Sequence, residues 1–94
     1  MMMTLTFADA RAIVRNAEEP FWNAEGTFHV AEIGREDATH FYVYAGPREE
    51  PRLESLTFTA FARFVSKKSG DVEVVPMISA LDRLGRMTEV SSRV

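Results

Sequence analysis

Few side chains in this sequence could bind a metal or take part in catalysis, and those few lack partners at useful spacings. The chain has two histidines, His29 and His40, and no cysteine. A zinc site needs three or four ligands, so two histidines without a fixed carboxylate beside them indicate surface residues. We therefore expect no metal and no cofactor.

Nucleophilic and acid–base chemistry finds no better support. No serine stands in a G-x-S-x-G context, and no glycine-rich phosphate loop is present. The acidic pairs Glu18-Glu19 and Glu49-Glu50 are adjacent in the chain. Their carboxylates should point apart, which suits solvation better than catalysis. The sequence predicts a protein that is not an enzyme.

Charge and composition also limit the partners. The 94 residues carry 11 Lys and Arg against 14 Asp and Glu, a net charge of −3, which disfavours nucleic acid. No apolar run approaches the roughly 20 residues that span a bilayer, so we expect no membrane partner. The absence of cysteine favours a reducing compartment, and hence a cytoplasmic location.

The hydrophobic pattern predicts a single α+β domain over residues 1–94. It should be an antiparallel four-stranded meander with an N-terminal helix packed on one face and a short C-terminal helix. The expected elements, in chain order, are a helix over 6–19, strands over 27–33, 38–45, 56–66 and 72–75, and a helix over 77–87. The ends, 1–4 and 88–94, should be flexible.

Local signals support the two helices. Thr6 should cap the first helix by accepting a hydrogen bond from the Asp9 amide, and Pro20 should end it. The apolar stripe of this helix comprises Phe7, Ala10, Ile13, Val14 and Ala17. The apolar side of the C-terminal helix comprises Ile78, Leu81 and Leu84.

The first hairpin is predicted to turn at 34–37. A two-residue loop there favours a register in which one face of the sheet carries Phe28, Val30, Phe41 and Val43. The other face would carry His29, Ala31, Ile33, His40, Tyr42 and Tyr44. One helix can cover only one face, so the second face should be solvated, dimerised or bound to a partner.

This second face supplies most of the candidate binding residues. Tyrosine has a broad apolar ring and a polar tip, which suits interfaces. The candidates on the face are His29, His40, Tyr42 and Tyr44. Trp22 lies in a loop, where it either closes the core or lines a pocket. The acidic pair Glu49-Glu50 lies in the exposed loop 46–52.

Two segments resemble a known family. The run 64–72, FVSKKSGDV, is similar to the closing hairpin of the YrhB-like immunity-protein family, small bacterial domains associated with polymorphic toxin systems. The run 41–44, FYVY, resembles the central aromatic strand of that family. The similarity is one of layout over about residues 4–76. It implies a bacterial protein that binds and neutralises a toxin and has no catalysis of its own.

Three binding roles therefore stay open. The first is a protein-binding module of the immunity type, for which Tyr42→Ala or Tyr44→Ala should lower partner recovery in a pull-down. The second is a small-molecule or peptide binder with a helix–sheet pocket around Trp22. The third is a homodimer formed through the uncovered sheet face.

Overall fold

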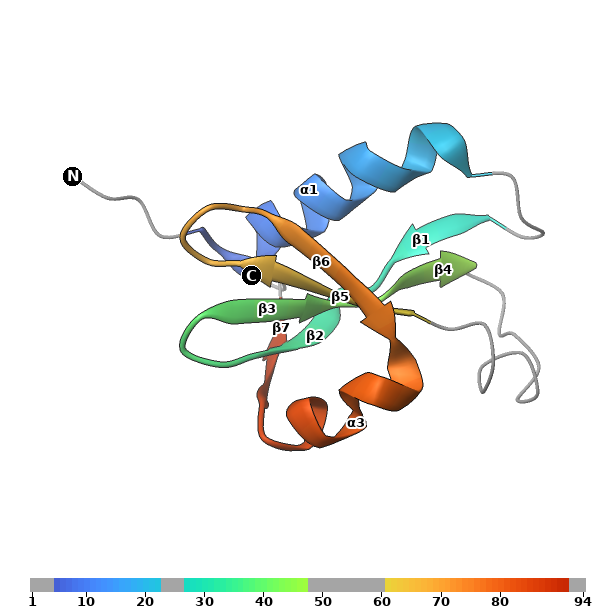
Figure 1. The fold of residues 1–94 in the computed structure, drawn as a ribbon. Helices are drawn as coiled ribbons and strands as arrows, with labels where there is room; N and C mark the ends of the chain where they lie inside the picture. Colours follow the sequence, from blue (N-terminus) through green and yellow to red (C-terminus); the bar gives the residue numbers. More distant parts are fainter. Residues whose placement is uncertain (1–4, 23–26, 48–60, 92–94) are drawn as a thin grey trace.

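Two helices lie on opposite faces of an antiparallel sheet in the computed structural model of this protein (Figure 1). The structure describes residues 5–22, 27–47 and 61–91. The helices are α1 (Phe7–Glu18), the short 3-10 helix η1 (Glu19–Phe21) and α3 (Met77–Gly85). The strands are β1 (Phe28–Val30), β2 (Ile33–Glu36), β3 (His40–Val43), β4 (Ala45–Pro47), β5 (Phe61–Ser66), β6 (Val72–Pro76) and β7 (Thr88–Ser91).

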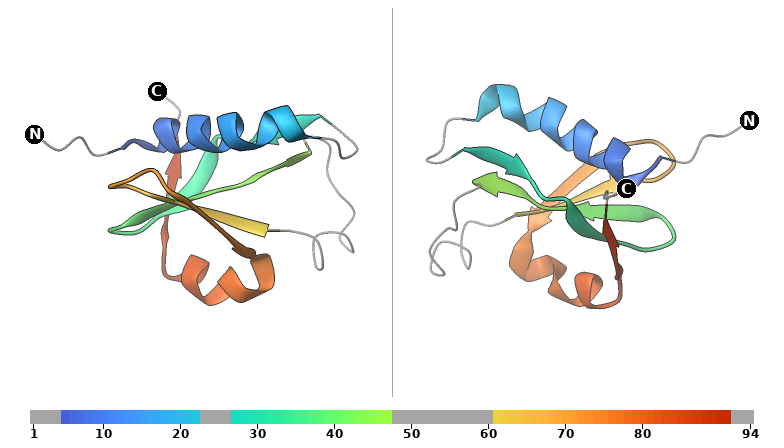
Figure 2. Two further views of the ribbon diagram at one scale, coloured as in Figure 1. Left: turned by 45° about the horizontal axis from the view of Figure 1, so that its top comes forward. Right: turned by 180° about the vertical axis from the view of Figure 1, so that it is seen from behind.

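The main sheet has five strands in the order β6-β5-β3-β2-β7, and β1 pairs with β4 in a separate two-stranded sheet. Every pairing is antiparallel. Figures 1 and 2 show α1 above the sheet and α3 below it, with β1 and β4 extending beneath the later part of α1. The α+β class with a helix near each end and antiparallel pairing is confirmed. The four-stranded meander is wrong in detail.

Helix α1 has the predicted cap and apolar stripe. The Thr6 hydroxyl accepts a hydrogen bond from the Asp9 amide (3.1 Å), and the Asp9 carboxylate accepts one from the Thr6 amide (2.9 Å). This capping box satisfies two amides at the start of the helix. The buried residues of α1 are Phe7, Ala10 and Val14, whereas Ala17 is exposed.

The turn between β2 and β3 lies later in the chain than predicted. Residues 34–36 belong to β2, and Arg35 pairs with Tyr42. The turn forms around Asp37, whose Oδ1 accepts the amides of Thr39 and His40, each at 2.8 Å. An aspartate that binds the backbone ahead of it is a strong turn signal, and here it outweighs the glycine at position 34.

A β-bulge separates β1 from β2. Val30 pairs with Ala45 and Arg35 pairs with Tyr42, so residues 31–34 lie opposite residues 43–44, and the first strand has two extra residues there. The Ala31 amide still donates to the Tyr44 carbonyl (2.9 Å), so the hairpin stays continuous across the bulge. The register changes by an even number of residues, which keeps the predicted sorting. The residues predicted to share the core face, Phe28, Val30, Phe41 and Val43, are all buried.

The second face of the sheet is not bare, which corrects the expectation that a single helix covers the sheet. Helix α3 packs on it and forms a second core of Ala62, Phe64, Ala80 and Met87. Ala80 is the buried residue of α3, and Met77 and Leu84 are partly buried beside it. Ile78 and Leu81 instead point outward, so the predicted apolar side of this helix is also wrong.

Two features hold α3 in this position. The Arg35 guanidinium donates to the carbonyls of Leu84 and Met87, both at 3.3 Å, at the end of the helix. The Arg83 guanidinium lies 3.8 Å from the centroid of the Phe64 ring. Arg35 thus adds a donor at the helix end, where the Leu84 carbonyl also accepts from the Met87 amide (3.1 Å).

The segment expected to be a flexible end contains a strand. β7 pairs with β2 over four residues, and Val90 lies opposite Gly34. Val90 is partly buried against the core beneath α1, which explains why this polar stretch is ordered. Residues 1–4, the other expected flexible end, lie outside the described residues. Among the helices that are described, none is long and apolar enough to cross a membrane.

Gly34 permits the contact between α1 and the sheet. A β-carbon there would collide with the Tyr42 carbonyl oxygen and would lie 2.7 Å from the Phe7 ring. The backbone oxygen cannot swing aside as a flexible side chain would. The glycine that the sequence places in a turn is therefore a packing residue at the centre of β2.

We expect Gly34→Ala to destabilise the protein by about 1–3 kcal/mol, the usual cost of forcing atoms into a packed core. Gly85→Ala is the matched control, because nothing lies within 4 Å of the β-carbon it would add. Gly85 ends α3, so its replacement should be neutral or stabilising by up to about 1 kcal/mol. Urea unfolding of both variants measures the difference, and equal stabilities would contradict this account of Gly34.

Candidate functional site

The four candidates predicted to share a bare face are separated in the structure. His29 lies on β1, in the two-stranded sheet, and His40 begins β3 at the other end of the hairpin. Tyr42 lies beneath α3, and Tyr44 falls between β3 and β4. All four side chains are partly buried. They do not form one open surface.

Tyr42 belongs to the core beneath α3. Its ring centroid lies 5.8 Å from that of Phe64. Burial raises the pKa of the Tyr42 hydroxyl, and the nearby Tyr44 adds to the shift. A tyrosine with a raised pKa stays protonated at neutral pH and is a poorer general base. Replacement of Tyr42 by alanine would remove core packing, so lost partner recovery would not identify an interface.

Trp22 closes one end of the other core. Its ring packs edge-on against Phe28 with centroids 5.3 Å apart, and it is partly buried against the cluster beneath α1. Of the two roles considered for Trp22, closing the core or lining a pocket, the structure therefore shows the first. The acidic pair Glu49-Glu50 lies outside the described residues.

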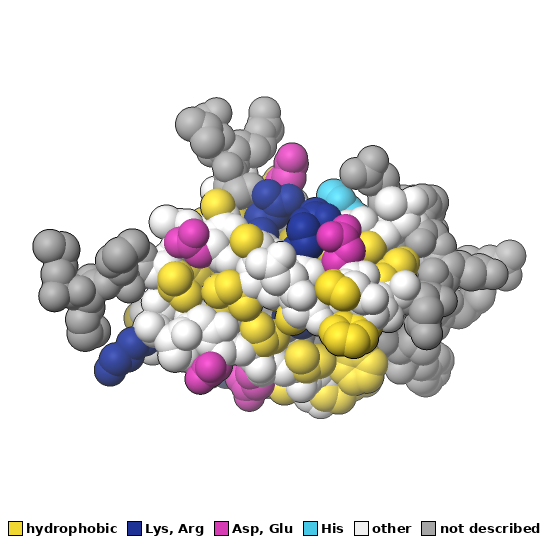
Figure 3. Space-filling view, turned by 90° about the horizontal axis from the view of Figure 1, so that it is seen from above, with side chains coloured by type: hydrophobic (Ala, Val, Ile, Leu, Met, Phe, Trp, Pro, Cys, Tyr) yellow, Lys and Arg dark blue, Asp and Glu magenta, His cyan; other side chains and the backbone are white. Residues whose placement is uncertain are grey.

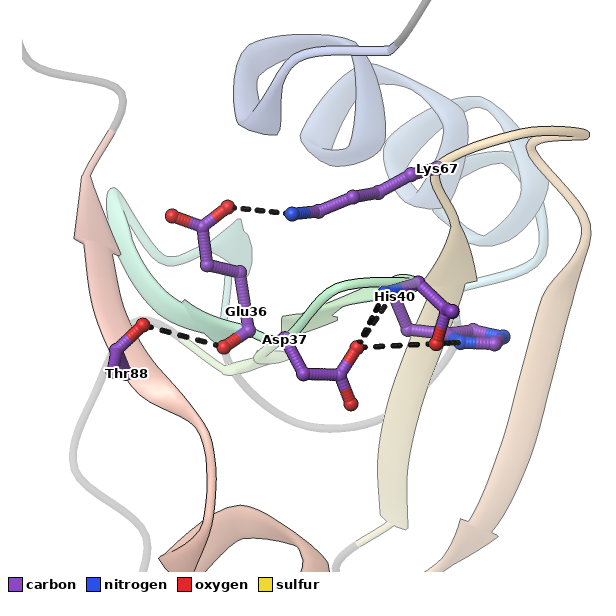
Figure 4. A network of polar contacts seen from close by, with 6 residues as sticks. Glu36, Asp37, His40, Lys67 and Thr88 are labelled. Carbon is purple, nitrogen blue, oxygen red and sulfur yellow. Dashed lines mark hydrogen bonds and ion pairs between the residues drawn. The ribbon is translucent and has the colours of Figure 1, made fainter.

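A cluster of an acid, a hydroxyl and an imidazole forms at the β2–β3 turn (Figure 4). The Thr39 hydroxyl lies 2.8 Å from Nδ1 of His40 and 3.2 Å from Oδ1 of Asp37. In a nucleophile–base–acid triad the carboxylate must bind the imidazole. Here it binds the hydroxyl and two backbone amides, so the cluster builds a turn rather than a catalytic site. The spacing D-x-T-H was its signal in the sequence.

Hydrogen bonding controls the charge of Asp37. Burial by itself raises the pKa of the Asp37 carboxyl, but the amides of Thr39 and His40 and the Thr39 hydroxyl outweigh it and hold that pKa below its ordinary value. The positive charge of Arg83 acts in the same direction. The turn therefore prefers the ionised carboxylate.

An ion pair beside this turn joins β2 to the β5–β6 hairpin. Lys67 Nζ lies 2.8 Å from Oε1 of Glu36, and it also lies 4.8 Å from the centroid of the Phe41 ring. The Lys67 amide donates to the Thr39 carbonyl (2.9 Å). Figure 4 shows Glu36 reaching Lys67 on one side while its carbonyl accepts from Thr88 of β7 on the other. These groups are all occupied in holding strands together.

Metal chemistry finds no site in the described part of the chain. No group of three or more His, Asp or Glu side chains comes close enough there to hold an ion. The polar clusters formed by the described residues thus have structural explanations.

Exposed apolar side chains gather around β6 and the start of α3. Phe61 pairs with Pro76, and Val74 is the diagonal neighbour of Phe61 on the same face. Ile78 follows Pro76 by two residues, and Leu81 lies nearly one turn further along α3. We call this set the apolar rim: Phe61, Val74, Pro76, Ile78 and Leu81. Figure 3 views the molecule from the α1 side and shows hydrophobic side chains exposed on that face, whereas Ile78 and Leu81 belong to α3, which lies on the opposite side of the sheet (Figure 1).

The rim is unusually exposed for such side chains. Ile78 is 70% exposed, Leu81 57%, Val74 53% and Phe61 45%. Single exposed apolar residues are ordinary, but several of them on neighbouring elements are typical of surfaces that bind other molecules. Sequence reasoning missed it because it placed Ile78, Leu81 and Leu84 together on the apolar side of the C-terminal helix. Only the position of α3 under the sheet shows that Ala80 takes the inner place.

No protein-family model, no curated protein and no solved structure matches this chain. The functional interpretation therefore rests on the geometry of this chain.

The Asp37 turn predicts a pH dependence of stability. A carboxyl whose pKa is lowered by folding stabilises the folded state above its unfolded pKa of about 3.9. This contribution is lost as the pH falls through the lower folded value. Asp37→Ala should therefore cost about 1 kcal/mol at pH 7, and the gap to the natural protein should narrow below about pH 4.

Urea unfolding at pH 7 and at pH 3 measures both effects. Asp82→Ala is the control, because Asp82 is exposed and its carboxylate makes no hydrogen bond to any described residue. This control should leave stability nearly unchanged at both values. A gap between Asp37→Ala and the natural protein that is the same at pH 3 as at pH 7 would refute the assignment.

Proposed function

We propose that this protein is a non-catalytic protein-binding module whose contact surface is the apolar rim. The observation that carries the proposal is the exposure of Phe61 and Val74, which are neighbours on β5 and β6, together with that of Ile78 and Leu81 on α3, the helix that directly follows β6. The polar clusters of the described residues support it indirectly, because each has a structural role and none aligns a nucleophile with a base.

The rim has the physical character of a binding surface. Burial of a fully exposed Leu, Ile, Val or Phe side chain contributes about 1.5–3 kcal/mol. Four such side chains at about half exposure could contribute several kcal/mol, a large part of the roughly 8 kcal/mol of micromolar affinity. Two charged residues near the rim in the sequence are also exposed, Asp82 in α3 and Arg86 directly after it. An apolar centre with a polar border is typical of protein interfaces.

The rim replaces the Tyr42 and Tyr44 face as the surface to test first. Tyr42 is partly covered by α3, whereas Ile78 and Leu81 lie on the outer side of that helix. Substitutions at Ile78 and Leu81 remove apolar surface without opening a cavity.

The double variant Ile78→Ser/Leu81→Ser should lose partner binding while it keeps the stability of the natural protein. Affinity capture of a partner, followed by titration with that purified partner, measures the effect. We expect affinity to fall at least about tenfold, since two hot-spot side chains are removed.

Ile33→Ser is the matched control for this experiment. Ile33 is also a large apolar residue, 49% exposed, but it lies on β2 outside the rim. Its replacement should leave affinity unchanged. If the rim variant binds the partner as well as the natural protein does, the rim is not the contact surface.

The partner class that the family resemblance implies is a toxin. The supporting feature is the layout of an N-terminal helix, an antiparallel sheet and the closing hairpin at 64–72. Co-expression with a toxin-like reading frame adjacent to its gene tests this proposal. If co-expression neither rescues growth nor yields a complex, the partner is not that toxin, and the protein remains a binding module with a different partner.

A further inference from the structure

The open edge of β6 is the part of the rim that carries a more specific inference. β6 is the outermost strand of the five-stranded sheet, next to β5. Edge strands offer unpaired backbone groups to other chains unless they are covered or interrupted. Which groups β6 offers can be derived from the hydrogen bonds of its hairpin.

The direction of each backbone group along β6 follows from the turn that precedes it. The Ser66 amide donates to the Asp71 carbonyl (2.9 Å), so the Asp71 carbonyl points inward to β5. The backbone N–H and C=O groups of successive residues in an antiparallel strand point alternately toward one neighbouring strand and toward the other. Glu73 and Val75 therefore also bond inward. Val72 and Val74 direct both their N–H and C=O groups outward.

Pro76 fits this alternation. Like Val74, residue 76 directs its backbone nitrogen outward, away from β5. A proline fits this position because its missing N–H breaks no hydrogen bond to β5. No described residue forms a hydrogen bond with the outward groups of Val72 and Val74. The two N–H groups and their carbonyls thus form a short template for another strand.

The side chains on the two sides of β6 define what such a strand should carry. Val72, Val74 and Pro76 lie on the face toward α1, and Val74 is more than half exposed. Glu73 lies on the face toward α3, where one of its oxygens binds Arg83 (3.1 Å) and its side chain is 55% exposed. An added strand should therefore place apolar residues beside Val74 and a Lys or Arg beside Glu73.

A second copy of this chain is a poorer occupant. If two β6 strands paired about Glu73, the two carboxylates would lie directly opposite one another, which is destabilising. If they paired about Val74 or Val75, Pro76 would fall opposite Val72 or Val74. Its missing N–H would then remove a hydrogen bond from each side of the pair. Like charge and proline together disfavour each of these three self-pairings.

We propose that β6 accepts an extended segment of the partner as an added antiparallel strand, and that this segment alternates apolar and basic residues. This inference rests on the proposed binding role of the rim. It adds the mode of recognition, because main-chain hydrogen bonds to Val72 and Val74 supply affinity and the side chains beside Glu73 supply selectivity.

Amide hydrogen exchange tests the edge directly. In the free protein the amides of Val72 and Val74 should exchange faster than those of Glu73 and Val75. A synthetic peptide of alternating Val and Lys should slow exchange at Val72 and Val74 by about tenfold or more at saturation. A Val and Glu peptide of equal length should have little effect, and Glu73→Lys should reverse this preference.

Several outcomes would overturn the inference. These are slow exchange at Val72 and Val74 in the free protein, no protection by the Val and Lys peptide at millimolar concentration, or equal protection by both peptides. Protection that rises with the concentration of the protein alone would identify a second copy as the occupant.

A backbone variant separates this inference from the proposed function. Val74→Pro removes the outward N–H but no bond to β5, and circular dichroism checks that it folds. It should abolish protection by the peptide and weaken capture of the partner. If Ile78→Ser/Leu81→Ser loses the partner while Val74→Pro retains it, the rim is the contact surface and strand addition is wrong. If both variants retain the partner, both proposals fall.

Discussion

The central strand β3 imposes the constraint on which the architecture depends. Successive side chains of a strand point to opposite faces. In β3 both faces are apolar, with Phe41 and Val43 toward α1 and Tyr42 toward α3. A sheet with two apolar faces needs a cover on each. The chain meets this need with a helix near each end, and β7 then returns to the edge beside β2, so that the C-terminal region folds onto the N-terminal hairpin.

Polar side chains determine where these layers meet. Arg35 lies on β2 and binds the end of α3, whereas Arg63 lies on β5 and reaches the opposite layer. Arg63 Nε lies 2.5 Å from a Glu18 oxygen of α1, and its Nη1 donates to the Ala45 carbonyl (3.3 Å). A half-buried ion pair adds little net stability, because desolvation offsets much of the attraction. Its contribution here is to hold α1 over the place where β4 continues beyond β3.

The same packing explains the surface. Ala80 lets α3 approach the Phe64 ring closely, and this turns Ile78 and Leu81 outward. α1 and α3 cover the faces of the sheet, and within the described residues no strand pairs with the outer edge of β6. The rim and the edge are therefore consequences of how the core is filled. An exposed apolar surface of this kind cannot be found by looking for reactive side chains.

Local chemistry determined the elements whose signals lie within a few residues of one another. The Thr6 cap of α1 and the sorting of Phe28, Val30, Phe41 and Val43 to one face both followed from the sequence. Tertiary packing decided the rest. Gly34 lies in a strand, where the Phe7 ring occupies the space that a side chain would need. The C-terminal segment forms β7, and Val90 of this strand packs against the core. The helical pattern of α3 allowed more than one inward face, and only contact with Phe64 selected Ala80. The candidate site changed for the same reason, since exposure depends on contacts between residues far apart in the chain.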